Sequence, residues 1–523
     1  MRFLYNNISV LAVFSVCAVF AWLFGGTRGE YLIPVMPWVF ALCVEIMLCF
    51  PQRRQGETSY EARERVWENM RKDPLVWVSI GLGALLLVPF LNVGLCEICD
   101  YPLIVAGADK EPTVPFVPFC VNRIEHLNVV MWMFPALAAV IACRHALVKR
   151  GKRLLIEMIV WNGAALGVLG MVQQMTGASG PLWIEPQEAF FFSAFGYPNM
   201  AGDYFTTVFG LAVGLWRWKL DDAGDTSVKV KPKGARGGDA AGSEPKNGDE
   251  ENFSSNGKQT HRRRLFWKKN YFLIPAFLCF FCAVSTLSRA SIILVTALLA
   301  VFFLHTFVSF FFRMKKAQRV RAGLFSAAAL ALIAVCALSS MPENVRKEID
   351  TLNTTEVLDR VTGKGQYHVR VATEIWKDNF LFGVGGWGYK HFCIPYMTEK
   401  ELKELQTVGG INVHNDHLQF LAEHGIVGFG LMVAIVTLLI WPLGRIWKAM
   451  VDSVRFVPVR QQPPRPVQLF VIPPPVFCIL MTATATVIHG FGDCPLRSPA
   501  VLTLFLVSLA AMDGFLPRLR NDN

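Results

Sequence analysis

The chain has 523 residues, of which 53% are hydrophobic and only 17% are charged, and its mean hydropathy is +0.38. A soluble protein of this length needs more charge on its surface, so the composition excludes an ordinary soluble protein. We attribute the formal net charge of +11 to membrane topology and anionic lipid headgroups, and we expect no nucleic-acid partner.

Apolar runs recur along the chain, each long enough to cross about 30 Å of hydrocarbon. We predict an all-α polytopic membrane protein with about 12 transmembrane helices. The first run follows a single Arg2 and lacks a small-residue cleavage site, so we expect it to be retained. The predicted spans are 8–24, 31–50, 74–94, 127–143, 154–175, 200–216, 270–285, 291–312, 322–340, 425–444, 470–490 and 498–514.

The Lys and Arg residues predict the orientation, because basic loops are retained on the cytoplasmic side. Most of the 51 basic residues share one side of the membrane when the N-terminus is placed in the cytoplasm, and every short loop agrees. Both termini are therefore predicted to be cytoplasmic. The segment 341–424 is predicted to lie outside.

Five segments follow from this topology. The segment 219–269 is rich in Gly, Ser, Lys and acidic residues and has almost nothing to bury, which is typical of a disordered linker. The outer loop contains helix signals, including Thr398 and Glu401 in capping-box spacing, and a long ordered loop is usually functional. The segments are transmembrane helices 1–6 over 1–218, a disordered basic cytoplasmic linker over 219–269, transmembrane helices 7–9 over 270–340, an outer, partly helical loop that we expect to be functional over 341–424, and transmembrane helices 10–12 over 425–523.

Polar residues gather at the outer ends of the predicted spans. Charged groups near the hydrocarbon are expensive and usually face a polar cavity or a partner. Because all of these residues fall on one face, they predict an outward-facing site. They are Tyr197, Pro198 and Asn199 before the sixth span, Ser288 and Arg289 between the seventh and eighth, Arg370 and His414 in the outer loop, and His489 and Asp493 after the eleventh.

Arg289 is the only charged residue in the apolar stretch 270–312. One interpretation is an arginine that snorkels to the outer headgroups. The other is an anchor for a phosphate, because a guanidinium binds phosphate oxygens in a bidentate manner.

Two further motifs invite specific hypotheses. The GVGGWG sequence at 383–388 satisfies the dinucleotide pattern, but that pattern requires a βαβ unit, so we predict a turn that brings the backbone close to another group. Cys96, Cys99 and Cys120 share an outer loop and could form a disulfide. A redox or zinc pair at Cys96 and Cys99 lacks a second pair to support it.

A polar cluster precedes the tenth span. His414 and His417 share a helix face with Asp416 beside them, but a third well-spaced metal ligand is not apparent, so we expect no metal. His414 followed by the amide of Asn415 suits proton transfer, because the pKa of histidine lies near working pH. The alternative is a polar cluster that caps the helix.

Five stretches resemble, in this order, the signature stretches of the O-antigen ligase and polymerase superfamily. They are FGYPNMAGDYF (195–205), STLSRAS (285–291), RVATEIWKDNFLFGVGGWGYKHF (370–392), VHNDHLQFLAEHGIVGFGLM (413–432) and HGFGDCPLRSPAVLTLF (489–505). The resemblance implies a bacterial inner-membrane glycosyltransferase with a GT-C type fold, a large periplasmic loop and a periplasmic active site. The implied reaction moves a glycan from an undecaprenyl diphosphate carrier to a lipid A-core sugar, another repeat unit or a protein, with inversion and without metal or cofactor.

The resemblance also implies roles for single residues. Arg289 and Arg370 match the arginines expected to grip the diphosphate, His414 matches the catalytic histidine, and Asn415 matches its companion. We expect four further residues to support the site: Asn199, Glu423, His489 and Asp493.

His417 departs from the family pattern, which more often has an aromatic or apolar residue there, and this slightly favours a metal. Two outer acid pairs, Asp109 with Glu111 and Glu348 with Asp350, are of a kind that metal-dependent oligosaccharyltransferases use, but short acid pairs are common by chance.

The main competing hypothesis is a transporter or flippase of a lipid-linked or amphipathic anion. Transporters usually show internal repeats and broken helices near the membrane midplane. Here the polar groups lie at one face beside a long outer loop, which favours surface chemistry. A receptor or scaffold would leave Arg289 unexplained.

Overall fold

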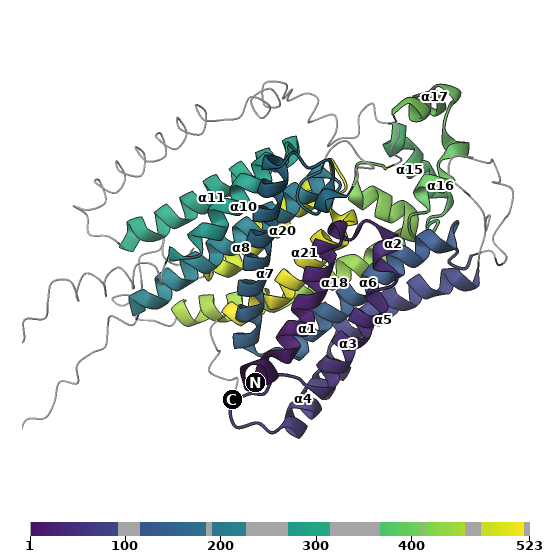
Figure 1. The fold of residues 1–523 in the computed structure, drawn as a ribbon. Coiled ribbons are helices and arrows are strands. Elements are labelled where there is room, and N and C mark those ends of the chain that lie inside the picture. Colours follow the sequence, from purple (N-terminus) through teal and green to yellow (C-terminus); the bar gives the residue numbers. More distant parts are fainter. Residues whose placement is uncertain are drawn as a thin grey trace, which may run out of the picture.

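The computed structural model describes residues 2–92, 114, 116–184, 191–225, 270–313, 367–408, 412–455 and 472–516. Within these ranges the regular elements are helices, which confirms the all-α prediction (Figure 1). The α-helices are α1 (Arg2–Trp22), α2 (Gly29–Leu32), α3 (Met36–Cys49), α4 (Ser59–Lys72), α5 (Pro74–Leu87), α6 (Arg123–His145), α7 (Lys149–Met175), α8 (Pro198–Asp225), α10 (Leu273–Ser285), α11 (Arg289–Arg313), α15 (Tyr367–Asp378), α16 (Tyr389–Phe392), α17 (Glu399–Val408), α18 (Asp416–Arg455), α20 (Pro474–His489) and α21 (Pro499–Ala511). The 3-10 helices are η1 (Phe24–Gly26), η2 (Val88–Leu91), η3 (Pro181–Trp183), η4 (Ile394–Tyr396), η5 (Pro495–Arg497) and η6 (Met512–Phe515).

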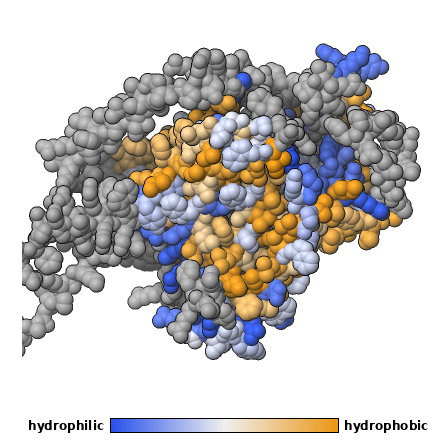
Figure 2. Space-filling model, viewed as in Figure 1, coloured by the Kyte–Doolittle hydropathy of each residue, from blue (hydrophilic) through white to orange (hydrophobic). Residues whose placement is uncertain are grey.

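The helices form an apolar bundle. Among the described residues, five helical segments are long and apolar enough to cross a membrane: α5 with η2, α6, α7, α11 and the first part of α18. Five further apolar helices are shorter, namely α1, α3, α10, α20 and α21 with η6. On the face drawn in Figure 2, apolar side chains cover much of the bundle, while hydrophilic ones gather near α4 and, at the other end, near α17. The count of twelve spans stays a prediction, and the ninth predicted span, 322–340, lies outside the described residues.

Helix α8 lies at the centre of the bundle. It packs against α7, α10, α11, α20 and α21, and every residue from 200 to 215 is buried. The helix continues past residue 219 to Asp225, and Lys219 forms an ion pair of 3.0 Å with Glu157 of α7. The start of the predicted linker is therefore helical, and its remainder, 226–269, lies outside the described residues.

Helices α15, α16 and α17 form a small unit, which we call the cap, at one end of the bundle (Figure 1). The predicted capping box is present, since the backbone N–H of Thr398 donates to Glu401 at 2.7 Å and the N–H of Glu401 donates to the Thr398 hydroxyl at 3.4 Å. The cap has its own apolar core, separate from that of the bundle. This core contains Phe119, Val121, Val371, Ala372, Ile375, Val384, Tyr389, Cys393, Met397, Val413 and Ala422.

Helix α18 is interrupted at Gly425, whose φ of 62° and ψ of −173° suit only glycine. The backbone N–H groups of Val384 and Gly385 donate to the two carbonyls before the break at 3.1 and 2.8 Å. The two N–H groups after the break donate to carbonyls of the same loop at 2.9 and 3.1 Å. The glycine-rich motif therefore forms the predicted turn, and its backbone fills the gap in the hydrogen bonding of α18.

Of the three cysteines for which the sequence leaves a disulfide possible, only Cys120 lies in the described residues. Cys120 is a buried free thiol. Cys96, Cys99 and both acid pairs lie outside the described residues.

Candidate active site

His414 is held in an unusual backbone conformation directly before α18. Its φ is 52°, in the left-handed region that non-glycine residues adopt mainly at strained, often functional, positions. Its Nδ1 lies 3.3 Å from Oδ1 of Asp493, and the His414 side chain is 46% exposed whereas that of Asp493 is 6% exposed. In this arrangement Asp493 contacts the Nδ1 side of a half-exposed ring.

Asp493 lies in the turn after α20 and is the centre of a hydrogen-bond network. Its carboxylate accepts from the Tyr197 hydroxyl at 3.1 and 3.2 Å, from the Asn199 amide and from the backbone N–H of Cys494 at 2.8 Å. Burial acts to raise the pKa of Asp493, but the hydrogen bond with His414 and the neighbouring histidine charges outweigh burial and hold the pKa below its usual range. The carboxylate is therefore ionised and orients the His414 ring.

The rest of the polar cluster before the tenth span is structural. Asn415 caps α18, because its side-chain oxygen accepts from the N–H of Leu418 at 3.0 Å. Asp416 is buried and accepts from the N–H of Leu496 at 2.7 Å. His417 has Nε2 3.0 Å from the Val487 carbonyl. The helix-capping interpretation thus describes Asn415, whereas Asp416 and His417 bond to other segments. His414 is the exposed histidine of the cluster.

His489 forms a buried ion pair rather than an exposed one. Its Nδ1 lies 3.0 Å from Oδ1 of Asp203 in α8, and both side chains are only 1% exposed. The Thr486 hydroxyl donates to the other Asp203 oxygen at 2.8 Å. This cluster fixes the end of α20 against α8, one turn from Asn199.

Arg289 is the first residue of α11 and is half-buried. The preceding Ser288 caps the helix, since its hydroxyl accepts from the N–H of Ser291 at 3.2 Å. Gly202 of α8 packs against Ser291 so closely that a Cβ there would overlap with the serine hydroxyl. The first turns of α8 therefore contact α11 on one side and α20 on the other, and they connect the Arg289 turn to the Asp493 network.

Arg370 is placed differently from Arg289. It lies on α15 in the cap, where it forms ion pairs of 2.8 Å with both Glu374 and Glu401. The residue of α15 that is coupled to His414 is His368, whose pKa is lowered to about 4 by burial and by the nearby His414. His368 also has Nδ1 3.0 Å from the Tyr389 hydroxyl.

Glu423 is paired with Arg497. The two side chains are 2% and 10% exposed and 2.5 Å apart. The Arg497 guanidinium also lies 4.5 Å from the centre of the Trp387 ring. The pair joins α18, which carries Glu423, to η5, which carries Arg497, and to the glycine-rich turn at Trp387. Glu423 therefore holds these three segments together by packing and by charge.

Metal-ligand types gather at one point among the described residues: His414, Asp493 and Cys494, with potential ligand atoms within 4.8 Å of one another. His417, the metal candidate from sequence, is not in this group. Burial and the neighbouring Asp493 and Asp416 raise the pKa of the Cys494 thiol well above its usual value. A protonated thiol is a poor metal ligand.

Comparison with known proteins identifies the domain that contains most of these residues. Residues 274–433, which include Arg289, Arg370 and His414, match the family model described as O-antigen ligase. This segment is similar to the O-antigen ligase family, and the match covers 160 of the 523 residues. The match confirms the resemblance to the O-antigen ligase and polymerase superfamily, whose members are glycosyltransferase-like enzymes, and together with the apolar helices it indicates an integral membrane protein. No curated protein was found to match the chain.

The range that matches the O-antigen ligase model does not contain the whole candidate site. Asp203 precedes the matched range, and Asp493 and Arg497 follow it. Asp203, His368 and Arg497 were missed as site residues from the sequence. Two of them carried a signal, because Asp203 and Arg497 lie within stretches that resemble the family. His368 carried none, since only the fold brings it near His414.

Proposed function

We propose that the protein is a glycosyltransferase that moves a glycan from an undecaprenyl diphosphate carrier to an acceptor hydroxyl at the periplasmic face of the bacterial inner membrane. The observation that carries the proposal is His414, an exposed histidine oriented by the buried, ionised Asp493. The O-antigen ligase domain supports the same class of reaction.

His414 acts as the general base. Its Nε2 takes the proton of the acceptor hydroxyl as that oxygen forms a bond to the anomeric carbon of the glycan. The bond from that carbon to the diphosphate oxygen breaks on the opposite side, which inverts the anomeric centre. Asp493 accepts from Nδ1–H and stabilises the imidazolium that forms, while Tyr197 and Asn199 hold the carboxylate.

The leaving diphosphate needs fixed positive charge. Arg289 provides it at the N-terminus of α11, where the helix dipole also favours an anion. Arg370 is the second candidate, and it forms ion pairs with Glu374 and Glu401 in the cap. We expect Arg289 to contribute more to donor binding than Arg370 does, because the first turn of α11 adds backbone N–H groups and the helix dipole to its charge.

Ligase activity toward a lipid A-core or other surface acceptor is the first form of the proposal, and polymerisation of repeat units is the second. Membrane lipids, the lipid-linked donor and a glycan, lipid or protein acceptor are the expected partners. A transporter or flippase of a lipid-linked anion remains the hypothesis of another class. The strained, oriented His414 favours bond formation over transport, because a transport site has no need of a general base.

The test is glycan transfer in membranes by His414→Ala and Arg289→Ala, with His417→Gln as the matched control. A general base is worth roughly 100- to 10,000-fold in rate, so the His414 variant should lose transfer while still inserting, and the His417 variant should retain most of it. Full transfer by both alanine variants would refute the assigned roles. Loss of transfer on chelation would instead support a metal at His414, Asp493 and Cys494.

The product of a deletion strain separates the two forms. Intact polymer that is not attached to its acceptor indicates a ligase, whereas a product of single repeats indicates a polymerase.

A further inference from the structure

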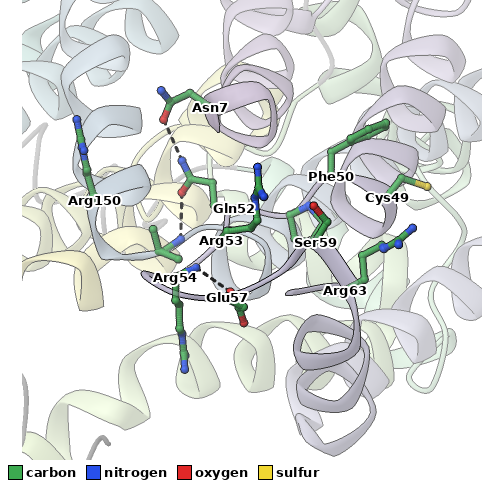
Figure 3. A pocket seen from close by; sticks show the side chains of 12 residues that line it. Asn7, Cys49, Phe50, Gln52, Arg53, Arg54, Glu57, Ser59, Arg63 and Arg150 are labelled. Carbon is green, nitrogen blue, oxygen red and sulfur yellow. Dashed lines mark hydrogen bonds between the residues drawn. The ribbon is translucent and has the colours of Figure 1, made fainter. Parts of the chain in front are cut away.

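A second polar cavity lies far from His414. It has a volume of about 550 Å³ and is formed by the segment after α3, the first turns of α4 and the start of α7 (Figure 3). Helix α6 shows how far the cavity lies from the end of the bundle where His414 is found. His126 in its first turn accepts from the backbone N–H of Gly386 beside the cap, while the residues that follow its last turn line the cavity. The 23 residues of α6 span about 35 Å, so the cavity is not part of the transfer site.

The floor of the cavity is rigid. Gln52 is buried, its backbone N–H donates to the Ala146 carbonyl at 2.9 Å, and its side-chain oxygen accepts from the N–H of Val148 at 3.1 Å. Its amide nitrogen donates to Asn7 of α1 at 3.0 Å. A Cβ at Gly151 would overlap with the Gln52 side chain. The cavity is therefore a built feature that ties α1, α6 and α7 together.

Four exposed arginines line the cavity, and their side chains extend from it in different directions (Figure 3): Arg53, Arg54, Arg63 and Arg150. The one carboxylate among the described lining residues, Glu57, is already held by Arg65 at 2.7 Å and by a backbone N–H at 2.7 Å. The guanidiniums of Arg54, Arg63 and Arg150 thus give the cavity positive charge from three separate segments of the chain. Guanidinium groups bind phosphate oxygens in a bidentate manner.

The same cavity meets an apolar surface. Cys49 and Phe50 line it, and Phe50 is 42% exposed. Trp38 and Leu42, 78% and 50% exposed, lie on the same face of α3 as Cys49 by helical spacing. Glu45 is also exposed on this face, about 6 Å along the axis from Cys49, which places its carboxylate near headgroup depth. An amphipathic ligand would therefore find charge in the cavity and apolar surface along α3.

We propose that this arginine cavity binds the phosphate group of an anionic phospholipid whose acyl chains lie along α3. A soluble phosphate would use the guanidiniums but not the exposed face of α3, and a zwitterionic lipid would bring its own positive charge to the arginines. The site is independent of the proposed glycan transfer.

The test uses the full chain in nanodiscs of phosphatidylglycerol or phosphatidylcholine. Cys49 is exposed, whereas the other cysteines of the described ranges are buried, so its alkylation by neutral N-ethylmaleimide, followed by peptide mass spectrometry, reports occupancy. The cavity variant is Arg54→Gln with Arg63→Gln and Arg150→Gln. The matched control removes equal charge outside the cavity, as Arg71→Gln with Arg445→Gln and Lys448→Gln.

We expect phosphatidylglycerol to slow Cys49 alkylation in the wild type and the control variant but not in the cavity variant. Affinity for the lipid should fall by about 100-fold in the cavity variant, at roughly 5-fold for each basic group. Equal alkylation of the wild type in both lipids would overturn the proposal, as would equal loss of protection in the control variant. Equal protection by inorganic phosphate in phosphatidylcholine would replace the lipid with a soluble anion.

Discussion

The substitution Asp493→Asn tests whether Asp493 orients the proposed general base, His414, because it leaves the base itself in place. The carboxylate gives His414 a charge-assisted hydrogen bond at 3.3 Å and also accepts from the side chains of Tyr197, Asn199 and Cys494. Charge-assisted hydrogen bonds are worth roughly 1.5–3 kcal/mol and neutral ones roughly 0.5–1.5 kcal/mol. Removing the charge should therefore cost about 1–2 kcal/mol in the transition state, or roughly 5- to 30-fold in kcat. This loss in kcat is smaller than the loss that we expect when the His414 base itself is removed.

The assay is transfer from lipid-linked donor by purified protein, with kcat and KM determined separately. We expect kcat to fall and KM for the donor to change little, because Asp493 does not reach the diphosphate in this scheme. Tyr197→Phe is the matched control, since it removes one donor to the same carboxylate and keeps the charge, and it should cost less than about 3-fold, at the lower end of a neutral hydrogen bond.

The amide that Asp493→Asn introduces would face hydrogen-bond donors, so some loss of thermal stability is expected and rates must be referred to folded protein. Wild-type kcat in Asp493→Asn would refute the orienting role. So would an equal loss in Tyr197→Phe, because the effect would then be one of packing rather than charge.

Three further predictions concern stability. Gly425→Ala should destabilise the folded protein by about 2–3 kcal/mol, because the φ of Gly425 is 62° and a Cβ would overlap with a carbonyl of the adjacent loop. The control is Gly430→Ala in the same helix, where a Cβ has open space. In thermal unfolding this control should be neutral or slightly stabilising. Burial and the His414 charge lower the pKa of His368 to about 4, so the unfolded chain binds a proton below about pH 6.5 that the folded chain does not. Stability should therefore fall from about pH 6.5 toward pH 4, and His368→Asn should flatten this dependence; an unchanged pH profile would contradict the shift. Arg497→Met should cost about 3–5 kcal/mol because it leaves Glu423 buried and unpaired, and Glu423→Gln combined with it should restore part of the loss in a double-mutant cycle.

Much of the helical architecture followed from local signals. Apolar runs predicted the bundle, and capping-box spacing predicted the start of α17, because both depend on residues close in sequence. His414 was predicted to be a site residue from the family-like stretch that contains it and from its polar neighbours. The structure adds which of those neighbours have a different role, since Asn415 caps the helix and His417 bonds to a backbone carbonyl.

The rest of the site depends on contacts between distant segments. His414 and Asp493 are separated by 79 positions and Asp203 and His489 by 286, and spacing alone cannot say which partner each acid takes. Arg370 shows the same limit, because its ion pair with Glu401 joins two helices of the cap. The pairing of buried charges depends on tertiary structure. The sequence therefore predicted which charged and polar residues belong to the site, and the fold determines which of them form pairs.

The break in α18 has a consequence for engineering. Because the loop before α16 supplies the hydrogen bonds that the helix lacks around Gly425, neither segment has a complete set of backbone partners without the other. A chimera that exchanges the cap between related proteins should therefore carry the helix through Val427 along with the loop. A junction placed at the start of α18 would combine a loop and a helix from different proteins, and it should give a protein that inserts into the membrane but does not assemble the end of the bundle that contains the cap.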